Sequence, residues 1–158
     1  MIDNIHDLPY RPGVGMMVIN NEGLVFVGKR IDTKAEAWQM PQGGVDEGED
    51  EETAAIRELE EEIGAKITNI IATSDKHFDY DLPKDLVPKI WNGKYRGQKQ
   101  RWFLFRFDGD DSEINIATKH AEFCQWKWVT IDELPEIIVP FKRDLYSKIV
   151  TEFKDLVQ

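Results

Sequence analysis

The stretch from Gly43 to Ala65 reads GGVDEGEDEETAAIRELEEEIGA and carries the strongest signal in this chain. Between Gly44 and Glu62 it holds ten acidic residues and one basic residue, Arg57. The whole chain has 30 acidic and 20 basic residues, so the remainder is nearly neutral, with 20 against 19. An acidic cluster this dense repels itself unless cations occupy it. The stretch therefore predicts a site for hard divalent metal ions.

The same stretch predicts a loop, a helix and a stop. Asp50 is a suitable N-cap, and Gly64 suits the end of the helix. At about 100° per residue, Glu58, Glu61 and Glu62 fall together on one helical face. Another face carries a largely apolar stripe in which Glu52 shares a side with Ile56, Leu59 and Ile63, and Ala55 lies on its edge. The helix is therefore expected to bury the stripe and to present three carboxylates as one cluster.

The spacing of fixed residues in this stretch resembles the Nudix box, which reads G, five residues, E, seven residues, then R-E-L-x-E-E-x-G. The matching residues are Gly43, Glu49, Arg57, Glu58, Leu59, Glu61, Glu62 and Gly64. The last position of the box is normally a larger aliphatic residue and is Ala65 here. The resemblance implies hydrolysis of a nucleoside diphosphate linked to another group. It also implies an α/β/α sandwich around a mixed sheet.

By this resemblance the box glutamates would hold Mg²⁺ or Mn²⁺, as two or more ions. The expected ligands are Glu58, Glu61 and Glu62, with the main-chain carbonyl of Gly43 as an extra oxygen. Glu58 or Glu61 would also take a proton from the attacking water. The structural residues of the box would be Glu49, Arg57 and Gly64, with Glu49 and Arg57 paired to brace the loop against the helix.

Glu122 is a further acidic candidate. In residues 122–128, strand alternation puts it on the side of Cys124, Trp126 and Trp128. A carboxylate on such an apolar face needs a partner, because an unpaired buried charge is costly. It is either half of a structural ion pair or a fourth acid that reaches the metal ions. The resemblance favours the second, because related enzymes carry a glutamate at the matching place.

The whole chain is expected to form a single domain over residues 1–158, a length sufficient for a substantial core. Its composition, 41% hydrophobic and 32% charged, is typical of soluble globular proteins. No segment has the apolar length of a signal peptide or a membrane span. The single cysteine, Cys124, cannot form an internal disulfide and is expected to be a small core residue. We expect a cytoplasmic monomer with no membrane partner and no disulfide-linked partner.

Strands are expected over residues 13–19, 24–30, 66–74, 101–107 and 122–129. The fourth of these carries large apolar side chains on both faces, which predicts burial on both sides. A short helical turn is expected over 131–138. A C-terminal helix follows, with a stripe made of Phe141, Leu145, Ile149, Phe153 and Val157. Strands with two substantial helices predict an α/β fold whose sheet is covered on both faces.

Five further motifs narrow the substrate. They are Tyr10-Arg11-Pro12, Trp38-Gln39-Met40-Pro41-Gln42-Gly43-Gly44, Tyr80-Asp81-Leu82-Pro83, Gly97-Gln98-Lys99-Gln100-Arg101-Trp102-Phe103 and Phe141-Lys142-Arg143. Together they resemble the bacterial RNA pyrophosphohydrolases, also known as dinucleoside polyphosphate hydrolases. The resemblance implies that Arg30, Phe141 and Lys142 hold the first nucleotides and that Arg11 holds a phosphate. Tyr80 would stack on a base.

Alternatives stay open at this point. The substrate is either the 5′ end of RNA or a dinucleoside polyphosphate, and one enzyme can act on both. A nucleotide-binding domain without turnover is the alternative from another functional class, but such domains typically lose a box glutamate, and none is missing here. Trp38 and Trp102 are equally well explained as core residues.

Overall fold

The computed structural model describes residues 5–32 and 36–157 of the chain. The strands are β1 (Tyr10–Ile19), β2 (Val25–Arg30), β3 (Gln42–Gly44), β4 (Ile70–Thr73), β5 (Phe78–Asp81), β6 (Gly97–Arg106) and β7 (Phe123–Val129). The α-helices are α1 (Glu51–Ile63), α2 (Leu134–Ile137) and α3 (Arg143–Phe153). Short 3-10 turns are η1 (Ile5–Asp7), η2 (Val87–Lys89), η3 (Trp91–Gly93), η4 (Asp111–Glu113), η5 (Ile131–Glu133), η6 (Pro140–Lys142) and η7 (Lys154–Leu156).

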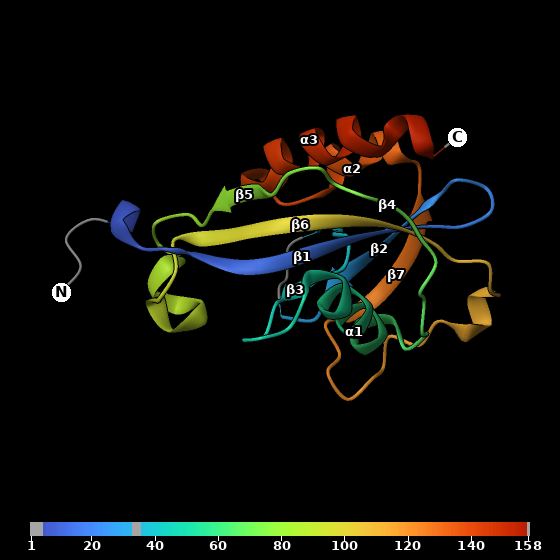
Figure 1. The fold of residues 1–158 in the computed structure, drawn as a ribbon, viewed down its shortest axis with the longest axis horizontal. Helices are drawn as coiled ribbons and strands as arrows, with labels where there is room; N and C mark the ends of the chain where they lie inside the picture. The colour runs from blue at the N-terminus through green and yellow to red at the C-terminus, as the bar shows by residue number, and fades with distance from the viewer. Residues whose placement is uncertain (1–4, 33–35, 158) are drawn as a thin grey trace.

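The strands form one mixed sheet in the order β4-β6-β1-β2-β7, with β3 paired to β1 and β5 paired to β6. The two longest strands, β1 and β6, run parallel over ten residue pairs, from Tyr10↔Gly97 to Ile19↔Arg106. The other pairings are antiparallel. Helices α2 and α3 cover one face of the sheet and α1 the other, as Figure 1 shows. The predicted α/β/α sandwich around a mixed sheet is confirmed.

Alternate side chains of the central strands enter two separate cores. From β1, Met16 packs on the α1 side, while Met17 packs on the α3 side. From β6, Phe105 lies on the α1 side and Trp102 on the α3 side, both fully buried. The prediction that this strand is buried on both faces is therefore correct, and Trp102 is a core residue.

Four of the five predicted stripe residues are buried. Leu145, Ile149 and Phe153 lie within α3, and Val157 follows it. Phe141 lies before the helix begins and is half-buried. The expected turn over 131–138 is present as η5 and α2. None of the helices in the described chain has both the length and the apolar character that a membrane span requires.

One strand prediction was too long, two strands were not predicted, and one core residue was misplaced. The strand expected over 66–74 covers only Ile70–Thr73, because residues 65–69 form the connection from α1 to the sheet. Strands β3 and β5 were not predicted, since each is three or four residues long and is defined by pairing with β1 or β6. Cys124 was expected in the core but is exposed.

Gly64 ends α1 in the left-handed conformation, with φ of 72°. Its main-chain N–H donates to the carbonyl of Glu60 at 2.9 Å. A methyl group at this position would lie 2.5 Å from the main-chain oxygen of Asn115. The helix stop therefore needs glycine for both its torsion and its contact with the next loop.

We predict that Gly64→Ala lowers the free energy of unfolding by more than Gly48→Ala does. Gly48 also has positive φ, 79°, but nothing lies within 4 Å of a methyl group placed there. The control therefore loses only the torsional term, about 1 kcal/mol, and Gly64→Ala adds the clash with Asn115. Urea unfolding of both variants measures the difference. Equal losses would mean that the Asn115 loop moves aside without cost.

Candidate active site

Helix α1 is fixed by caps that the sequence predicted. The Asp50 carboxylate accepts a hydrogen bond from the main-chain N–H of Thr53 at 2.7 Å. The buried side chains of the helix are Ala54, Ala55, Leu59, Glu62 and Ile63. The expected stripe is therefore displaced, because Ala54 and Glu62 join it while Glu52 is exposed.

This displacement gives different degrees of burial to the three carboxylates that were expected to form one cluster. The side chains of Glu58 and Glu61 keep 20% and 32% of their surface exposed, whereas Glu62 is only 1% exposed. Burial raises the pKa of Glu58 and raises that of Glu62 much further. For Glu62 the negative charges of Glu58 and Glu122 act in the same direction as burial.

Arg57 connects several groups of the acidic stretch through hydrogen bonds. Its Nε and Nη2 donate to the two carboxylate oxygens of Glu49 at 2.8 and 2.9 Å. Nη2 also donates to the main-chain oxygen of Gly44 at 3.2 Å. Nη1 reaches the carboxylates of Glu58 at 2.9 Å and Glu61 at 3.4 Å. One guanidinium therefore connects the loop before the helix to two of the box glutamates.

Gly43 brings strand β3 against the helix. A methyl group on Gly43 would lie 2.2 Å from the carboxyl carbon of Glu58, so only glycine leaves room for that carboxylate. The Gly43 carbonyl oxygen accepts a hydrogen bond from Gln98 Nε2 at 3.3 Å. The main-chain N–H of the preceding residue, Gln42, donates to the Glu62 carboxylate.

Glu122 lies beside this group but not on an apolar strand face. The β2–β7 register shifts between Lys29 and Arg30, and Cys124 is left unpaired in the shift. Glu122 therefore does not follow the strict alternation that the sequence suggested, and 45% of its side chain is exposed. Its carboxylate lies 3.6 Å from Arg30 Nη2.

Arg30 has a second acidic partner that the sequence reasoning missed. Its Nε and Nη2 donate to the carboxylate of Asp32 at 2.7 and 2.5 Å. The guanidinium holds the pKa of Asp32 below its usual range. The signal for this pair was an acid two residues after an arginine at the end of a predicted strand.

A polar network backs the site from β6. Gln100 Nε2 donates to Gln98 Oε1 at 2.8 Å and to Gln42 Oε1 at 3.1 Å. Trp102 Nε1 donates to Gln100 Oε1 at 2.9 Å. Gln98 and Gln100 are fully buried. The sequence motif that contains them was noted, but the two glutamines were given no role.

Lys142 and Tyr80 lie deeper than expected for residues that meet substrate. Lys142 is 6% exposed, and its Nζ lies 3.3 Å from Gln42 Oε1 and 4.9 Å from the centre of the Tyr80 ring. Burial, aided by the charge of Arg30, lowers the pKa of Lys142 to about 7. Tyr80 is also 6% exposed, and its ring lies 6.1 Å from that of half-buried Phe141. Tyr80 therefore contacts both Phe141 and Lys142 and exposes little ring surface on which a base could stack.

The donor groups fit a divalent cation, although they are not gathered into a finished site. Among the described residues, no three His, Cys, Asp or Glu side chains surround one point as metal ligands would. Arg57 engages Glu58 and Glu61, and Arg30 engages Glu122. Glu62 Oε2, however, is buried without a hydrogen-bond partner. A buried, unsatisfied carboxylate oxygen next to other carboxylates suits a hard cation.

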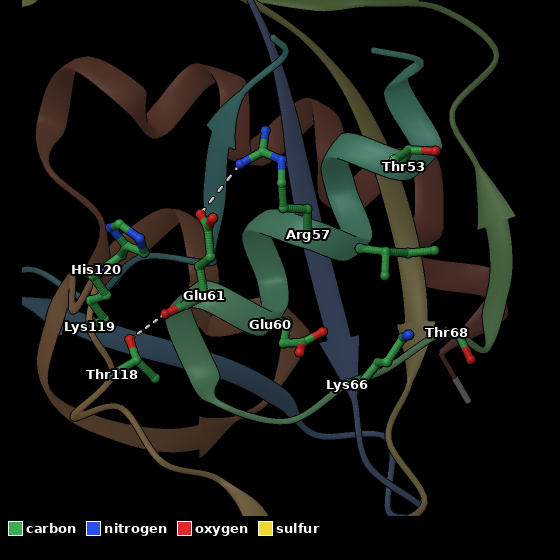
Figure 2. Close-up of a pocket in the computed structure, with 10 residues that line it drawn as sticks. Thr53, Arg57, Glu60, Glu61, Lys66, Thr68, Thr118, Lys119 and His120 are labelled. Carbon is green, nitrogen blue, oxygen red and sulfur yellow. Dashed lines mark hydrogen bonds and ion pairs between the residues drawn. The ribbon is translucent and has the colours of Figure 1, made fainter.

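A cavity of about 770 Å³ lies on the outer side of α1 (Figure 2). Arg57 and Glu61 line it together with Thr118, Lys119 and His120 from the loop before β7. The Thr118 hydroxyl donates to the main-chain oxygen of Glu61. Glu62, Lys142 and Tyr80 do not line this cavity.

Comparison with known proteins gives a consistent result. Residues 9–149 match the model of the NUDIX domain. The chain is 59% identical over 152 residues to the RNA pyrophosphohydrolase of Rickettsia typhi, covering 96% of this chain and 94% of that one. The E. coli dihydroneopterin triphosphate pyrophosphohydrolase has a similar fold, with a TM-score of 0.66, 17% identity, and coverage of 90% and 98%. A C. elegans Ap4A hydrolase also has a similar fold, with a TM-score of 0.60 and 21% identity. The match covers 88% of this chain and 96% of that one.

We predict that Glu49→Gln destabilises the protein by about 2 kcal/mol near neutral pH, because two charge-assisted hydrogen bonds to Arg57 are weakened. The pair lowers the pKa of Glu49 from 4.5 to about 2, so its contribution is complete above pH 4.5 and is lost as pH falls toward 2. Urea unfolding of both proteins between pH 3 and 7 should show a difference that shrinks on acidification. A difference independent of pH would contradict this account.

Proposed function

Because the chain belongs to the NUDIX family, we propose that it removes pyrophosphate from the 5′ end of triphosphorylated RNA and leaves a 5′-monophosphate end. The observation that carries this proposal is the 59% identity to an RNA pyrophosphohydrolase over nearly the whole of both chains. The chain is a Nudix pyrophosphohydrolase, and all the glutamates of its box are present.

NUDIX hydrolases use divalent metal ions, and we propose two or more Mg²⁺ or Mn²⁺ ions here. Bound cations neutralise phosphate charge and acidify a water molecule. The proposed ligands are the carboxylates of Glu58, Glu61, Glu62 and Glu122 and the Gly43 carbonyl oxygen. Glu62 has an unsatisfied buried oxygen for this purpose. Glu58 or Glu61 accepts the proton of the attacking water, and the raised pKa of Glu58 supports its candidacy as a base.

On the substrate side, Arg11 contacts a phosphate, and Arg30, Phe141 and Lys142 hold the first nucleotides. Phe141 is half-buried while Tyr80 is only 6% exposed, which supports stacking of a base on the ring of Phe141 rather than on Tyr80. Lys142 keeps a cation close to this ring, 5.9 Å from its centre. Tyr80 serves as the support behind both.

The proposed reaction produces a monophosphorylated RNA end, which gives the protein a role in mRNA decay. A cytoplasmic location fits an RNA substrate and a chain whose single cysteine forms no internal disulfide. We propose that the 158 residues act as a single NUDIX domain.

Replacing Glu62 tests the metal ligands. Glu62→Gln keeps the shape of the side chain and removes a buried negative charge. The negative charges of Glu58 and Glu122 repel that charge in the wild-type protein. We expect turnover to fall by about 100-fold or more, while the melting temperature stays equal or rises. Glu122→Gln should also reduce turnover with little change in stability, because its ion pair is half exposed. Turnover within tenfold of wild type at saturating Mg²⁺ would remove the substituted residue from the site.

A side-by-side assay tests the substrate. We expect pyrophosphate or phosphate release from a short triphosphorylated RNA, and cleavage of diadenosine tetraphosphate to ATP and AMP as a second activity. Phe141→Ala and Lys142→Ala should lose RNA turnover about tenfold while retaining more of the dinucleotide activity. Phosphate and pyrophosphate release is measured with Mg²⁺ on both substrates. Cleavage of the dinucleotide alone would make the protein a dinucleoside polyphosphate hydrolase, and no turnover on either would indicate a binding domain.

A further inference from the structure

Trp91 is a residue to which neither the sequence motifs nor the box assigns a role. It begins the turn η3, in the segment that links β5 to β6. Among the described residues other than glycine, only Trp91 and its neighbour Asn92 have positive φ, 52° and 57°. Two adjacent residues in the left-handed region are a source of backbone strain. Strained conformations persist only where surrounding contacts hold them, and they are frequent at functional sites.

The indole ring of Trp91 packs on the guanidinium of Arg11. The Arg11 Cζ atom lies 5.1 Å from the centre of the ring, within the range of a cation–π contact. The ring is itself half-buried, contacts Tyr95 edge to face at 6.1 Å, and packs against the α3-side core. The ring is therefore held by Tyr95 and the core while it contacts the arginine.

The same arginine lies against the box. A methyl group on Gly44 would lie 2.2 Å from Arg11 Nη2, so the guanidinium rests on the main chain of β3. Its positive charge lowers the pKa of both Glu58 and Tyr80, although burial dominates at each. Arg11 is thus close to a box carboxylate, Glu58, and to the buried ring of Tyr80.

Within residues 5–32 and 36–157, no carboxylate forms an ion pair with Arg11. Arg57 and Arg30, by contrast, are each held by acids. A carboxylate partner would orient the guanidinium but would occupy its N–H donors and neutralise its charge. An aromatic face orients the same group and leaves its in-plane donors available for phosphate oxygens.

We propose that Trp91 is a positioning residue that holds Arg11 toward the phosphates of the substrate through the face of its indole ring. This proposal rests on the proposed function, because it assumes a substrate with a polyphosphate chain. It does not require that Trp91 contacts a base. Substrate binding then depends on Trp91 only through Arg11.

The test combines three variants of Trp91 and Arg11. Trp91→Leu keeps an apolar side chain against the core and removes the aromatic face. We expect KM to rise about fivefold with kcat within twofold, from the usual strength of a cation–π contact. Trp91→Phe should stay within twofold of wild type, because it restores a face. In an Arg11→Ala background, Trp91→Leu should change KM by less than twofold.

Each variant is assayed on triphosphorylated RNA and on diadenosine tetraphosphate, with its melting temperature recorded. Lys127→Ala is the matched control, because it removes the cation from another pair of this kind, 4.3 Å from the ring of Trp38, and should leave KM unchanged. The proposal is overturned if Trp91→Leu raises KM equally with and without Arg11, or if it leaves KM within twofold of wild type. If RNA is not cleaved, the proposed function on RNA is wrong. The energetic coupling between Trp91 and Arg11 can still be measured with diadenosine tetraphosphate.

Discussion

The structure of the site depends on one guanidinium in a field of carboxylates. Arg57 is the single base between Gly44 and Glu62, and its donors meet Glu49, Glu58 and Glu61 as well as the Gly44 carbonyl. Without it the loop and the first turns of α1 would carry only like charges, which repel. Because Arg57 links the loop to the helix, it also fixes where β3 approaches the helix. The position of Gly43, and hence the space for the Glu58 carboxylate, follows from that link.

The two faces of the site satisfy charge in different ways. Glu58 and Glu61 remain partly exposed and share Arg57, whereas Glu62 is buried with one unsatisfied oxygen. Such a group costs free energy in the folded protein unless a cation or proton compensates it. If Glu62 is a metal ligand as proposed, its burial gives up stability for function, which is a common exchange in proteins.

Helical and strand periodicity predicted the parts of the fold that depend on local sequence. The caps at Asp50 and Gly64 and the two-sided burial of β6 follow from residue type and spacing alone. The depth of Glu62 does not, because periodicity gives the direction of a side chain and not what covers it. The environment of Glu122 was mispredicted for a different reason. The register shift beside Cys124 depends on pairing with β2, and strict alternation cannot anticipate a shift that arises between strands.

The cations of the site fall into two groups according to what holds them. Arg57 and Arg30 are paired with acids, and Glu49 and Asp32 occupy some of their N–H donors. Arg11 and Lys142 are held by aromatic rings instead, at 5.1 Å from Trp91 and 4.9 Å from Tyr80. An aromatic face attracts a cation without neutralising it, so Arg11 keeps its capacity to attract an anion. Burial lowers the pKa of Lys142 to about 7, so the charge of this lysine is held less firmly near neutral pH. In a chain with a net charge of −10, long-range attraction to a polyanion is weak. Under the proposed function, recognition of a phosphate chain relies on the few cations that the described part of the fold leaves without acidic partners.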